Sequence, residues 1–199
     1  MVNLPWPEIE AAAARGACVL LPLGIIEEHG PHLGLAVDTY TAYLLAVLSR
    51  RELGNRGLEA VIAPPLYWGM SAGTSAFAGT FTVRKDTAKA LIVDVLASLA
   101  RWKFERVFAV NWHADYHHCK TILEALSEAK DSTGIDVRLL VTPYDVRRLR
   151  LTGDEGNILI MASVPPVGEP SQYVDLHAGA LETGIMLEYF PEHVNAGLV

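Results

Sequence analysis

Carboxylates and imidazoles cluster in short segments of the chain. One segment contains Glu27 and His29, with Asp38 further on, and another contains His113 and Asp115. If each segment is extended, alternate side chains project to the same side while the side chain between them faces away. A carboxylate and an imidazole that converge in this way suit a divalent ion such as zinc or manganese. Both segments are therefore candidate metal-ligand pairs.

The two aspartates have further possible roles. Asp38 begins a helix-like stretch, which it could cap while still offering an oxygen to a metal. In two-metal hydrolytic sites a shared carboxylate can hold ions about 3.5–4 Å apart. Asp115 is as well placed to be the N-cap of the following helix as to bind metal. For His117 and His118, in the first turn of that helix, we expect a solvated or packed ring.

A third segment runs from Asp175 to Gly184. It places His177 just before a helix-like stretch, with Glu182 in the first part of that stretch. Both side chains could reach a site at a strand end. The same pattern also fits an ordinary helix start with one exposed acid, so this segment alone indicates little.

The elements that must position these residues follow from hydrophobic periodicity. Short apolar runs predict buried strands at Ala17–Leu23, Leu58–Ala63, Arg106–Asn111 and Asp136–Val141. Apolar residues spaced three and four apart predict helices at Thr39–Leu53, Asp86–Lys103, Tyr116–Lys130 and Gly179–Tyr189. Strands that alternate with helices indicate an α/β fold with a parallel sheet covered on both faces. Ligands of such sheets bind beyond the carboxyl ends of the strands, where the first two segments lie.

One long stretch, Thr152–Asp175, contains several glycines and prolines and predicts an irregular excursion. Irregular segments of that length inside a domain are usually functional or disordered. A lid over the site is a plausible role.

Composition narrows the class of protein. The 199 residues fit a single domain, 1–199, with one buried core. A formal net charge of -7 and scattered basic residues argue against nucleic-acid binding. Cys18 and Cys119 form no disulfide framework or metal-binding pair. The sequence shows no basic start of a signal peptide and no apolar run that could span a bilayer, so we expect a cytoplasmic protein without membrane contact.

Together the three segments resemble the creatininase family. Its members carry Glu-Gln-His-Gly-Pro-His followed by Asp-Thr, which Glu27–His32 and Asp38-Thr39 match except at Glu28. They carry Asn-Gly-His after a later strand, similar to Asn111-Trp112-His113. They also carry His-Ala-Gly-x-x-Glu-Thr, which His177–Thr183 reproduces. The order and spacing agree from about residue 17 to residue 194.

The resemblance implies a three-layer α/β sandwich with a mostly parallel sheet and a binuclear metal site. By this resemblance Glu27 and His113 hold one ion, His29 holds the other, and Asp38 bridges them. Asp115 stands where some members have a metal-binding glutamate, whereas in members with glycine there the later acid, here Glu182, lies near the metals. The resemblance also assigns His177 as the general acid/base, with Glu182 as a second candidate catalytic residue.

The chain departs from the family where members contact substrate. Gly69–Thr80 lacks a Glu-His pair that often precedes Phe-Pro-Gly-Thr, and Trp112 and Tyr116 replace the usual glycine and asparagine. We therefore expect Trp112 and Tyr116 to contact the substrate, and creatinine to be a poor one. Large aromatic side chains there favour a small planar or ring compound over a peptide.

The predicted function is metal-dependent hydrolysis of a C–N bond in a small cyclic amide or formamide, through a water activated by metal. Two divalent ions per subunit are expected, drawn from zinc, manganese or iron, and His177 would move the proton. A ring-opening hydrolase of an oxidised cyclitol or sugar-derived ketone is one alternative. A noncatalytic small-molecule-binding member of the fold is another. The resemblance also implies a homo-oligomer, a hexamer in many members.

Overall fold

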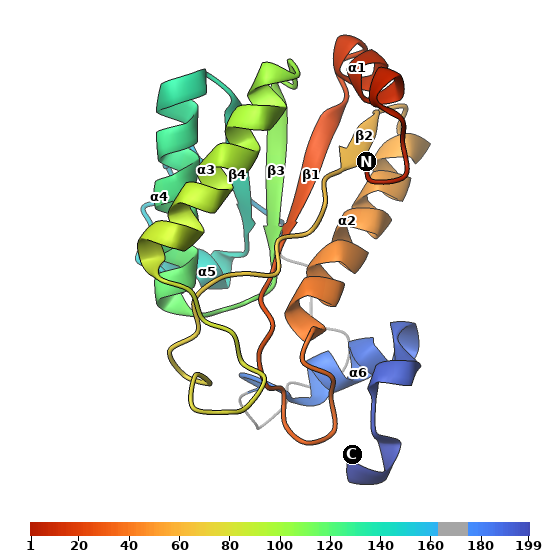
Figure 1. Cartoon of the computed structure of the whole chain (residues 1–199), viewed down its shortest axis with the longest axis vertical. Coiled ribbons are helices and arrows are strands. Elements are labelled where there is room, and N and C mark those ends of the chain that lie inside the picture. Colours follow the sequence, from red (N-terminus) through yellow and green to blue (C-terminus); the bar gives the residue numbers. More distant parts are fainter. Residues whose placement is uncertain (163–174) are drawn as a thin grey trace.

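A five-stranded sheet forms the centre of the fold. The computed structural model describes residues 1–162 and 175–199. Every neighbouring strand pair in the sheet is parallel, and the strand order is β2-β1-β3-β4-β5 (Figure 1). The strands are β1 (Cys18–Leu23), β2 (Ala60–Ile62), β3 (Arg106–Asn111), β4 (Asp136–Val141) and β5 (Ile158–Ile160). Their carboxyl ends therefore share one edge of the sheet.

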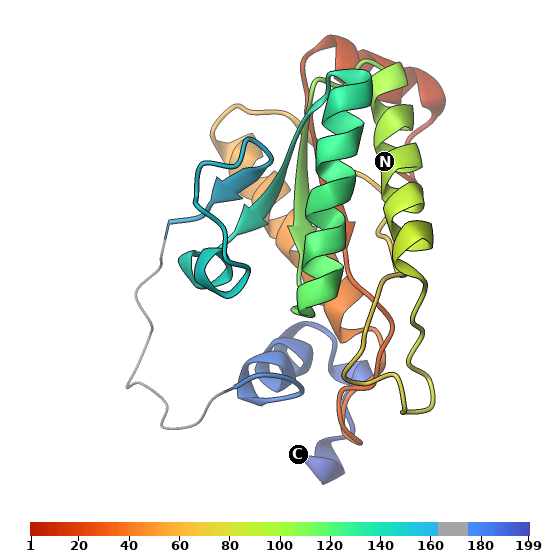
Figure 2. The ribbon, with the colours of Figure 1, turned by 90° about the vertical axis from the view of Figure 1, so that its left-hand side faces the viewer.

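Helices cover both faces of the sheet, which confirms the predicted three-layer α/β arrangement. Helices α3 (Lys85–Arg101) and α4 (Tyr116–Thr133) lie side by side on one face, and α2 (Val37–Asn55) covers the other (Figure 2). Helix α1 (Trp6–Ala14) lies near the amino ends of the strands, and α6 (Ala180–Tyr189) lies beyond their carboxyl ends (Figure 1). A short helix, α5 (Pro143–Arg148), follows β4, and 3-10 turns at Pro191–His193 and Ala196–Leu198 follow α6.

Alternation along β1 divides the core into two clusters. Val19 and Leu21 belong to the larger cluster, with residues of α3 and α4 such as Leu96 and Ile122. Leu20, one position away, belongs to the smaller cluster on the α2 side. Successive side chains of a strand point to opposite faces, so a strand with both faces covered is apolar at every position. All six residues of β1 are buried, which explains why the sequence predicted it.

Most predicted elements are confirmed, two of them to the residue. Strands β3 and β4 have the predicted bounds, and the predicted helices correspond to α2, α3, α4 and α6 with small shifts at their ends. The structure differs from the prediction in Thr152–Asp175, where Ile158–Ile160 form the edge strand β5. Three residues are too few to show a periodic pattern, and two of the three are exposed. Residues 163–174 of the predicted excursion lie outside the described part of the chain.

Helices α1 and α5 were not predicted from the sequence. Helix α1 is rich in alanine and only weakly patterned, with Ala12 its one buried residue. Helix α5 has no buried residue, so hydrophobic periodicity could not reveal it. Its N-terminus does carry a local signal, because Thr142 and Asp145 form a reciprocal capping box.

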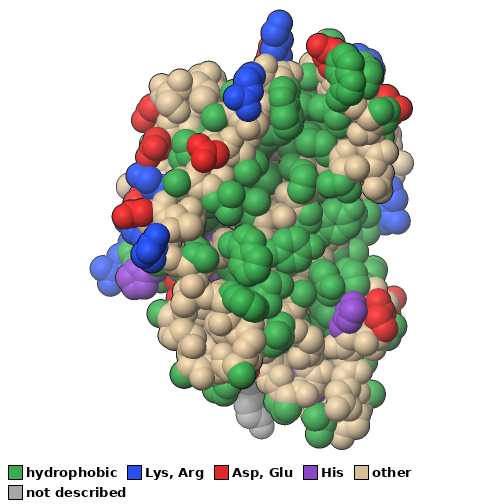
Figure 3. Space-filling model, in the orientation of Figure 1, with side chains coloured by type: hydrophobic (Ala, Val, Ile, Leu, Met, Phe, Trp, Pro, Cys, Tyr) green, Lys and Arg blue, Asp and Glu red, His purple; other side chains and the backbone are tan. Residues whose placement is uncertain are grey.

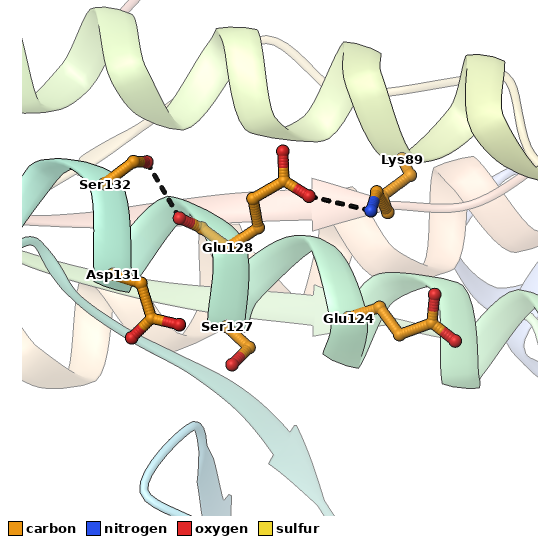
Figure 4. A pocket seen from close by; sticks show the side chains of 6 residues that line it. All are labelled: Lys89, Glu124, Ser127, Glu128, Asp131 and Ser132. Atoms are coloured by element: carbon orange, nitrogen blue, oxygen red, sulfur yellow. Dashed lines mark hydrogen bonds and ion pairs between the residues drawn. The ribbon is translucent and has the colours of Figure 1, made fainter.

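The surface differs from one face to another. Apolar side chains gather over the side of the molecule shown in Figure 3. A groove of about 850 Å³ lies between α1 and the end of α3. Its lining residues include Val2, Trp6, Val95 and Trp102. By contrast, ion pairs such as Lys89 with Glu128 join α3 and α4 at the surface (Figure 4). Among the described residues no helix combines the length and apolar character needed to cross a membrane.

Candidate metal centre

The candidate ligands meet where β1 and β3 end. Leu23 of β1 lies opposite Asn111 of β3, so the chain leaves both strands at the same level of the sheet. Gly24 then passes against the first turn of α2, where a Cβ atom would lie 2.6 Å from the backbone nitrogen of Thr39. This close approach needs glycine. It brings Asp38, in the first turn of α2, to the two strand ends.

Asp38 faces an imidazole with each of its carboxylate oxygens. Its Oδ1 lies 3.4 Å from Nε2 of His29, and its Oδ2 lies 3.1 Å from Nδ1 of His113. All three side chains are buried. A carboxylate that presents one oxygen to each of two histidines has the geometry of a bridging ligand.

Glu27 offers one oxygen to this cluster and is held by the other. Its Oε1 lies 2.8 Å from Nδ1 of His113. Its Oε2 accepts hydrogen bonds from the hydroxyls of Ser71, at 2.8 Å, and Thr74. The two hydroxyls therefore fix the carboxylate so that only Oε1 points toward His113.

Backbone carbonyls orient both histidines. Nδ1 of His29 donates to the carbonyl of Glu27 at 3.1 Å, and Nε2 of His113 donates to the carbonyl of Met70 at 2.9 Å. A carbonyl can only accept, so these contacts place the N–H on the far side of each ring. In the neutral ring the nitrogen that faces Asp38 then carries the lone pair that can bind a metal, and metal-binding histidines are usually fixed in this way.

Glu182 completes a second group of ligands. It lies in the first turn of α6, and its Oε2 lies 3.9 Å from Nε2 of His29. Its Oε1 accepts from the indole Nε1 of Trp112 at 3.1 Å, and Oε2 accepts from the backbone nitrogen of Ala178 at 2.6 Å. Both oxygens are thus anchored, one from the end of β3 and one from the start of α6.

His177 lies at the mouth of the cluster. Its Nε2 donates to the carbonyl of Glu28 at 2.7 Å, and its Nδ1 lies 3.9 Å from Oε1 of Glu27. The ring packs against His29 with centroids 4.3 Å apart, and about a third of the His177 side chain, 33%, is exposed. Nδ1 therefore faces the buried carboxylates from the solvent side.

Asp115 caps a helix instead of joining the cluster. Its Oδ1 accepts from the backbone nitrogen of His118 at 2.8 Å at the start of α4, and its Oδ2 accepts from that of Ala72 at 3.4 Å. Of the two roles left open by the sequence, the structure shows the N-cap. Among the described residues Asp115 belongs to none of the groups that could hold a metal, so this arrangement favours Glu182 as the second acid.

The two aromatic residues predicted to contact substrate, Trp112 and Tyr116, precede and follow Asp115 in the sequence. Trp112 contacts Glu182 through its indole nitrogen. Tyr116, the first residue of α4, is 41% exposed, and its ring lies against His117 and under the ammonium of Lys120. Contact of either residue with a substrate stays a prediction.

The cluster is strongly coupled electrostatically. Burial opposes the charge of Asp38, but its interactions with His113 and His29 prevail and hold the pKa of Asp38 below its usual value. Burial likewise opposes the charge of His113, yet Asp38 and Glu27 raise the pKa of His113 to about 10. In the polypeptide alone, a proton therefore sits between the imidazole and the carboxylates. A divalent cation would take the place of that positive charge.

The donor atoms fit a divalent metal. Three groups of side chains in the described part of the chain lie close enough to share an ion: Glu27 with Asp38 and His113, His29 with Asp38 and Glu182, and Glu27 with His29 and His177. Nε2 of His29 is buried, and no described residue makes a hydrogen bond with it. Such atoms are costly unless a ligand satisfies them. Nitrogen and oxygen donors of this kind suit zinc and manganese.

Sequence reasoning missed the residues that support the ligands. Ser71 and Thr74 lie in a segment without helix or strand periodicity, where two hydroxyls within two residues of a glycine were the only signal. Met70 acts through its backbone carbonyl, so the identity of its side chain gives no sign of this role. His118 was expected to be solvated or packed, and it is packed, with 3% of its surface exposed.

The chain has clear relatives. Residues 2–199 match the Creatininase family, described as creatinine amidohydrolase. The chain is 29% identical over 211 residues to the creatinine amidohydrolase of Pseudomonas putida, an alignment that covers 97% of this chain and 72% of that protein. It is 31% identical over 177 residues to a mycofactocin precursor peptide peptidase of Mycolicibacterium smegmatis, covering 88% of this chain and 59% of the peptidase.

A solved structure shares the fold. A protein described as "Creatininase Mn" superimposes with a TM-score of 0.68 at 26% identity, covering 98% of this chain and 74% of that chain. The three segments that resembled the family in sequence are also those that meet in space. The chain therefore belongs to the creatininase family of hydrolases.

Proposed function

We propose that this hydrolase uses two divalent ions to cleave a C–N bond in a small cyclic amide or formamide. The observation that carries the proposal is the position of Asp38, with one oxygen toward His29 and the other toward His113. Zinc, manganese and iron are the candidate ions, and the donor set suits each of them.

The side chains divide into two ligand sets around Asp38. Glu27 and His113 would hold one ion together with Asp38, and His29 and Glu182 would hold the other together with Asp38. Metal ions bound here would polarise a carbonyl oxygen and lower the pKa of a water molecule. Because Glu27, Asp38 and His113 are buried, their charges act in a medium of low dielectric constant, where they orient a dipole strongly.

His177 is the candidate for proton transfer. Its Nε2 is engaged with the Glu28 carbonyl, so the ring presents Nδ1 to the cluster. A histidine in this position can take a proton from the attacking group and give it to a leaving nitrogen. Its partial exposure leaves a route for exchange of that proton with solvent.

The similarity to a peptidase supports a second substrate class. The M. smegmatis relative is described as a precursor peptide peptidase, whereas the P. putida relative is described as a creatinine amidohydrolase. Both reactions break a C–N bond next to a carbonyl. The aromatic residues Trp112 and Tyr116 still favour a small planar compound over a peptide, because they add bulk where family members have small or polar residues.

Self-association and cytoplasmic location remain part of the proposal. Resemblance to the family suggests a homo-oligomer, and the apolar groove lined by Trp6 and Trp102 is a surface that a second subunit could cover. Measuring the molar mass in solution by light scattering tests this part independently of the chemistry.

The test of function has two stages. Metal content of the purified protein is measured first, with one to two equivalents expected. The metal-loaded protein is then offered creatinine, a formamide, a short peptide and a cyclitol ketone, and kcat/KM is compared. Hydrolysis of a cyclic amide or formamide supports the proposal. Preference for the peptide would overturn the substrate class, and absence of bound metal would overturn the mechanism.

A further inference from the structure

Two histidines of the same segment hold the backbone of Met70 between them. The carbonyl of Met70 accepts from Nε2 of His113 at 2.9 Å. The backbone nitrogen of Met70 donates to Nδ1 of His118 at 3.3 Å. His113 follows β3 and His118 lies in the first turn of α4, so both belong to the short segment that connects β3 to α4 and begins that helix. Met70 belongs to a different segment, between β2 and α3.

His118 is rigidly placed. Its ring is buried and packs edge-on against the ring of His113, with centroids 5.0 Å apart. Its backbone nitrogen donates to the N-cap carboxylate of Asp115 at 2.8 Å. Because Nδ1 accepts from an N–H group, that nitrogen carries no proton, and the ring is the neutral form with its proton on Nε2. A neutral ring fits a position beside a positively charged or metal-bound His113.

Gly69 allows the Met70 backbone to approach this ring. A Cβ atom at position 69 would lie 2.3 Å from Cε1 of His118 and 2.5 Å from Cγ2 of Ile25. No side chain fits there without displacing the segment. The carbonyl of Gly69 also accepts from the backbone nitrogen of Val83 at 2.8 Å, which closes the loop that carries Ser71 and Thr74.

We propose that His118 is a positioning residue for the first metal ion. By holding the backbone nitrogen of Met70, it fixes the carbonyl that accepts the hydrogen bond from Nε2 of His113, and thereby keeps Nδ1 of His113 toward Glu27 and Asp38. Among the described residues His118 belongs to none of the groups that could hold an ion. The proposal rests on the proposed function only in that Nδ1 of His113 binds metal.

The alternative is that His118 only fills space, and a matched pair of variants separates the two roles. His118→Asn places an amide oxygen, an acceptor, near the position of Nδ1. His118→Leu has a side chain of nearly the same shape as asparagine but no acceptor. Both variants lack the rest of the imidazole ring, so they differ mainly in the hydrogen bond to Met70. His117→Leu is the control, because His117 is the exposed neighbour on the same helix turn.

The readout is the zinc dissociation constant, measured by competition with a chromophoric chelator. His118→Leu should weaken binding of the tighter ion about 10- to 100-fold, the usual effect of losing a partner that orients a ligand. His118→Asn should restore most of that loss, and His117→Leu should bind as the wild type does. Equal loss in the asparagine and leucine variants, or no loss in either, overturns the proposal.

A second measurement needs no variant and no metal. The nitrogen chemical shifts of His118 in the wild-type protein show which ring nitrogen is protonated. An unprotonated Nδ1, together with slow exchange of the Met70 amide hydrogen, supports the proposal. A protonated Nδ1 would overturn it. Failure of the wild type to bind any of zinc, manganese and iron would instead overturn the proposed function, so the two failures are distinguishable.

Discussion

Trp112 anchors Glu182 across the site. The indole nitrogen at the end of β3 donates to Oε1 of Glu182 at 3.1 Å, and this pair links residues far apart in the sequence. Family members with Asn-Gly-His have no side chain at this position to make such a contact. In this chain Asp115 is engaged as the cap of α4, so the acid of the second ligand group comes from α6 and is held by the indole.

Trp112→Phe should therefore weaken binding of the second ion and leave binding of the first little changed. Phenylalanine keeps an aromatic ring but lacks the N–H that holds Glu182. We expect the affinity for the second metal equivalent to fall about 10-fold or more, with the first equivalent little changed. Calorimetric titration with zinc resolves the two steps. Trp102→Phe, at an exposed tryptophan that follows α3, is the control. An equal loss of affinity for both ions would mean that Trp112 stabilises the fold as a whole and does not specifically hold Glu182.

Asp38→Ala should remove both ions, because each oxygen of Asp38 faces a different ligand group. Metal content of the purified variant is the measurement, and most of the bound metal should be lost. Asp86→Ala is the control, since Asp86 is also an acid in the first turn of a helix but lies exposed on α3. If Asp38→Ala keeps a full complement of metal, Asp38 serves the helix alone.

Metal binding should release protons, since the pKa of His113 in the polypeptide alone is raised to about 10 by Asp38 and Glu27. At pH 8 the ring is then protonated before the metal binds and unprotonated afterwards. Affinity should rise about tenfold per pH unit below pH 10 while one proton is displaced. Calorimetry in two buffers with different ionisation enthalpies counts the protons released. No release at pH 8 would show that His113 is already neutral there.

The residues that could be predicted from the sequence are those whose identity carries the signal. Glu27, His29 and His113 follow apolar strands, and the carboxyl ends of parallel strands meet at one edge, so their convergence follows from the pattern. Asp115 shows the limit of that argument. The same side chain could cap α4 or bind metal, and only the geometry around His118 and Ala72 decided between the roles.

The supporting contacts could not be predicted, because they depend on backbone atoms and on segments without periodicity. Many other residue types at position 70 would offer the same backbone carbonyl to His113, so the sequence does not reveal this contact. The edge strand β5 is an apolar run of only three residues, Ile158–Ile160, with a single one buried, and the glycines and prolines around it indicate an irregular segment instead. Local patterns report what a side chain buries, whereas these features depend on where distant segments come together.

His177→Ala should retain metal and lose activity. His177 lies at the mouth of the cluster and is partly exposed, and Nδ1 is 3.9 Å from the nearest Glu27 oxygen. We expect kcat/KM to fall roughly 10²- to 10⁴-fold, the range for a positioned acid or base, with zinc content unchanged. His193→Ala, at a more exposed histidine, is the control. Loss of metal together with activity would make His177 a ligand in the group with Glu27 and His29.

Thr74 tests whether the orientation of Glu27 matters for the first ion. Its hydroxyl and that of Ser71 both donate to Oε2 of Glu27 and leave Oε1 for the cluster. Thr74→Val keeps the shape of the side chain but removes the donor, so Glu27 should rotate more freely. We expect the first ion to bind about 10-fold more weakly, because the carboxylate must be ordered on binding.

The matched control for this prediction is Thr74→Ser, which keeps the hydroxyl and loses only a methyl group. Its zinc affinity should stay close to that of the wild type, as measured by chelator competition. Ser71→Ala should resemble Thr74→Val, and the double variant should bind more weakly than either single one, since the two hydroxyls share one oxygen. If Thr74→Val and Thr74→Ser weaken binding equally, the methyl packing of Thr74 matters and its hydrogen bond to Glu27 does not.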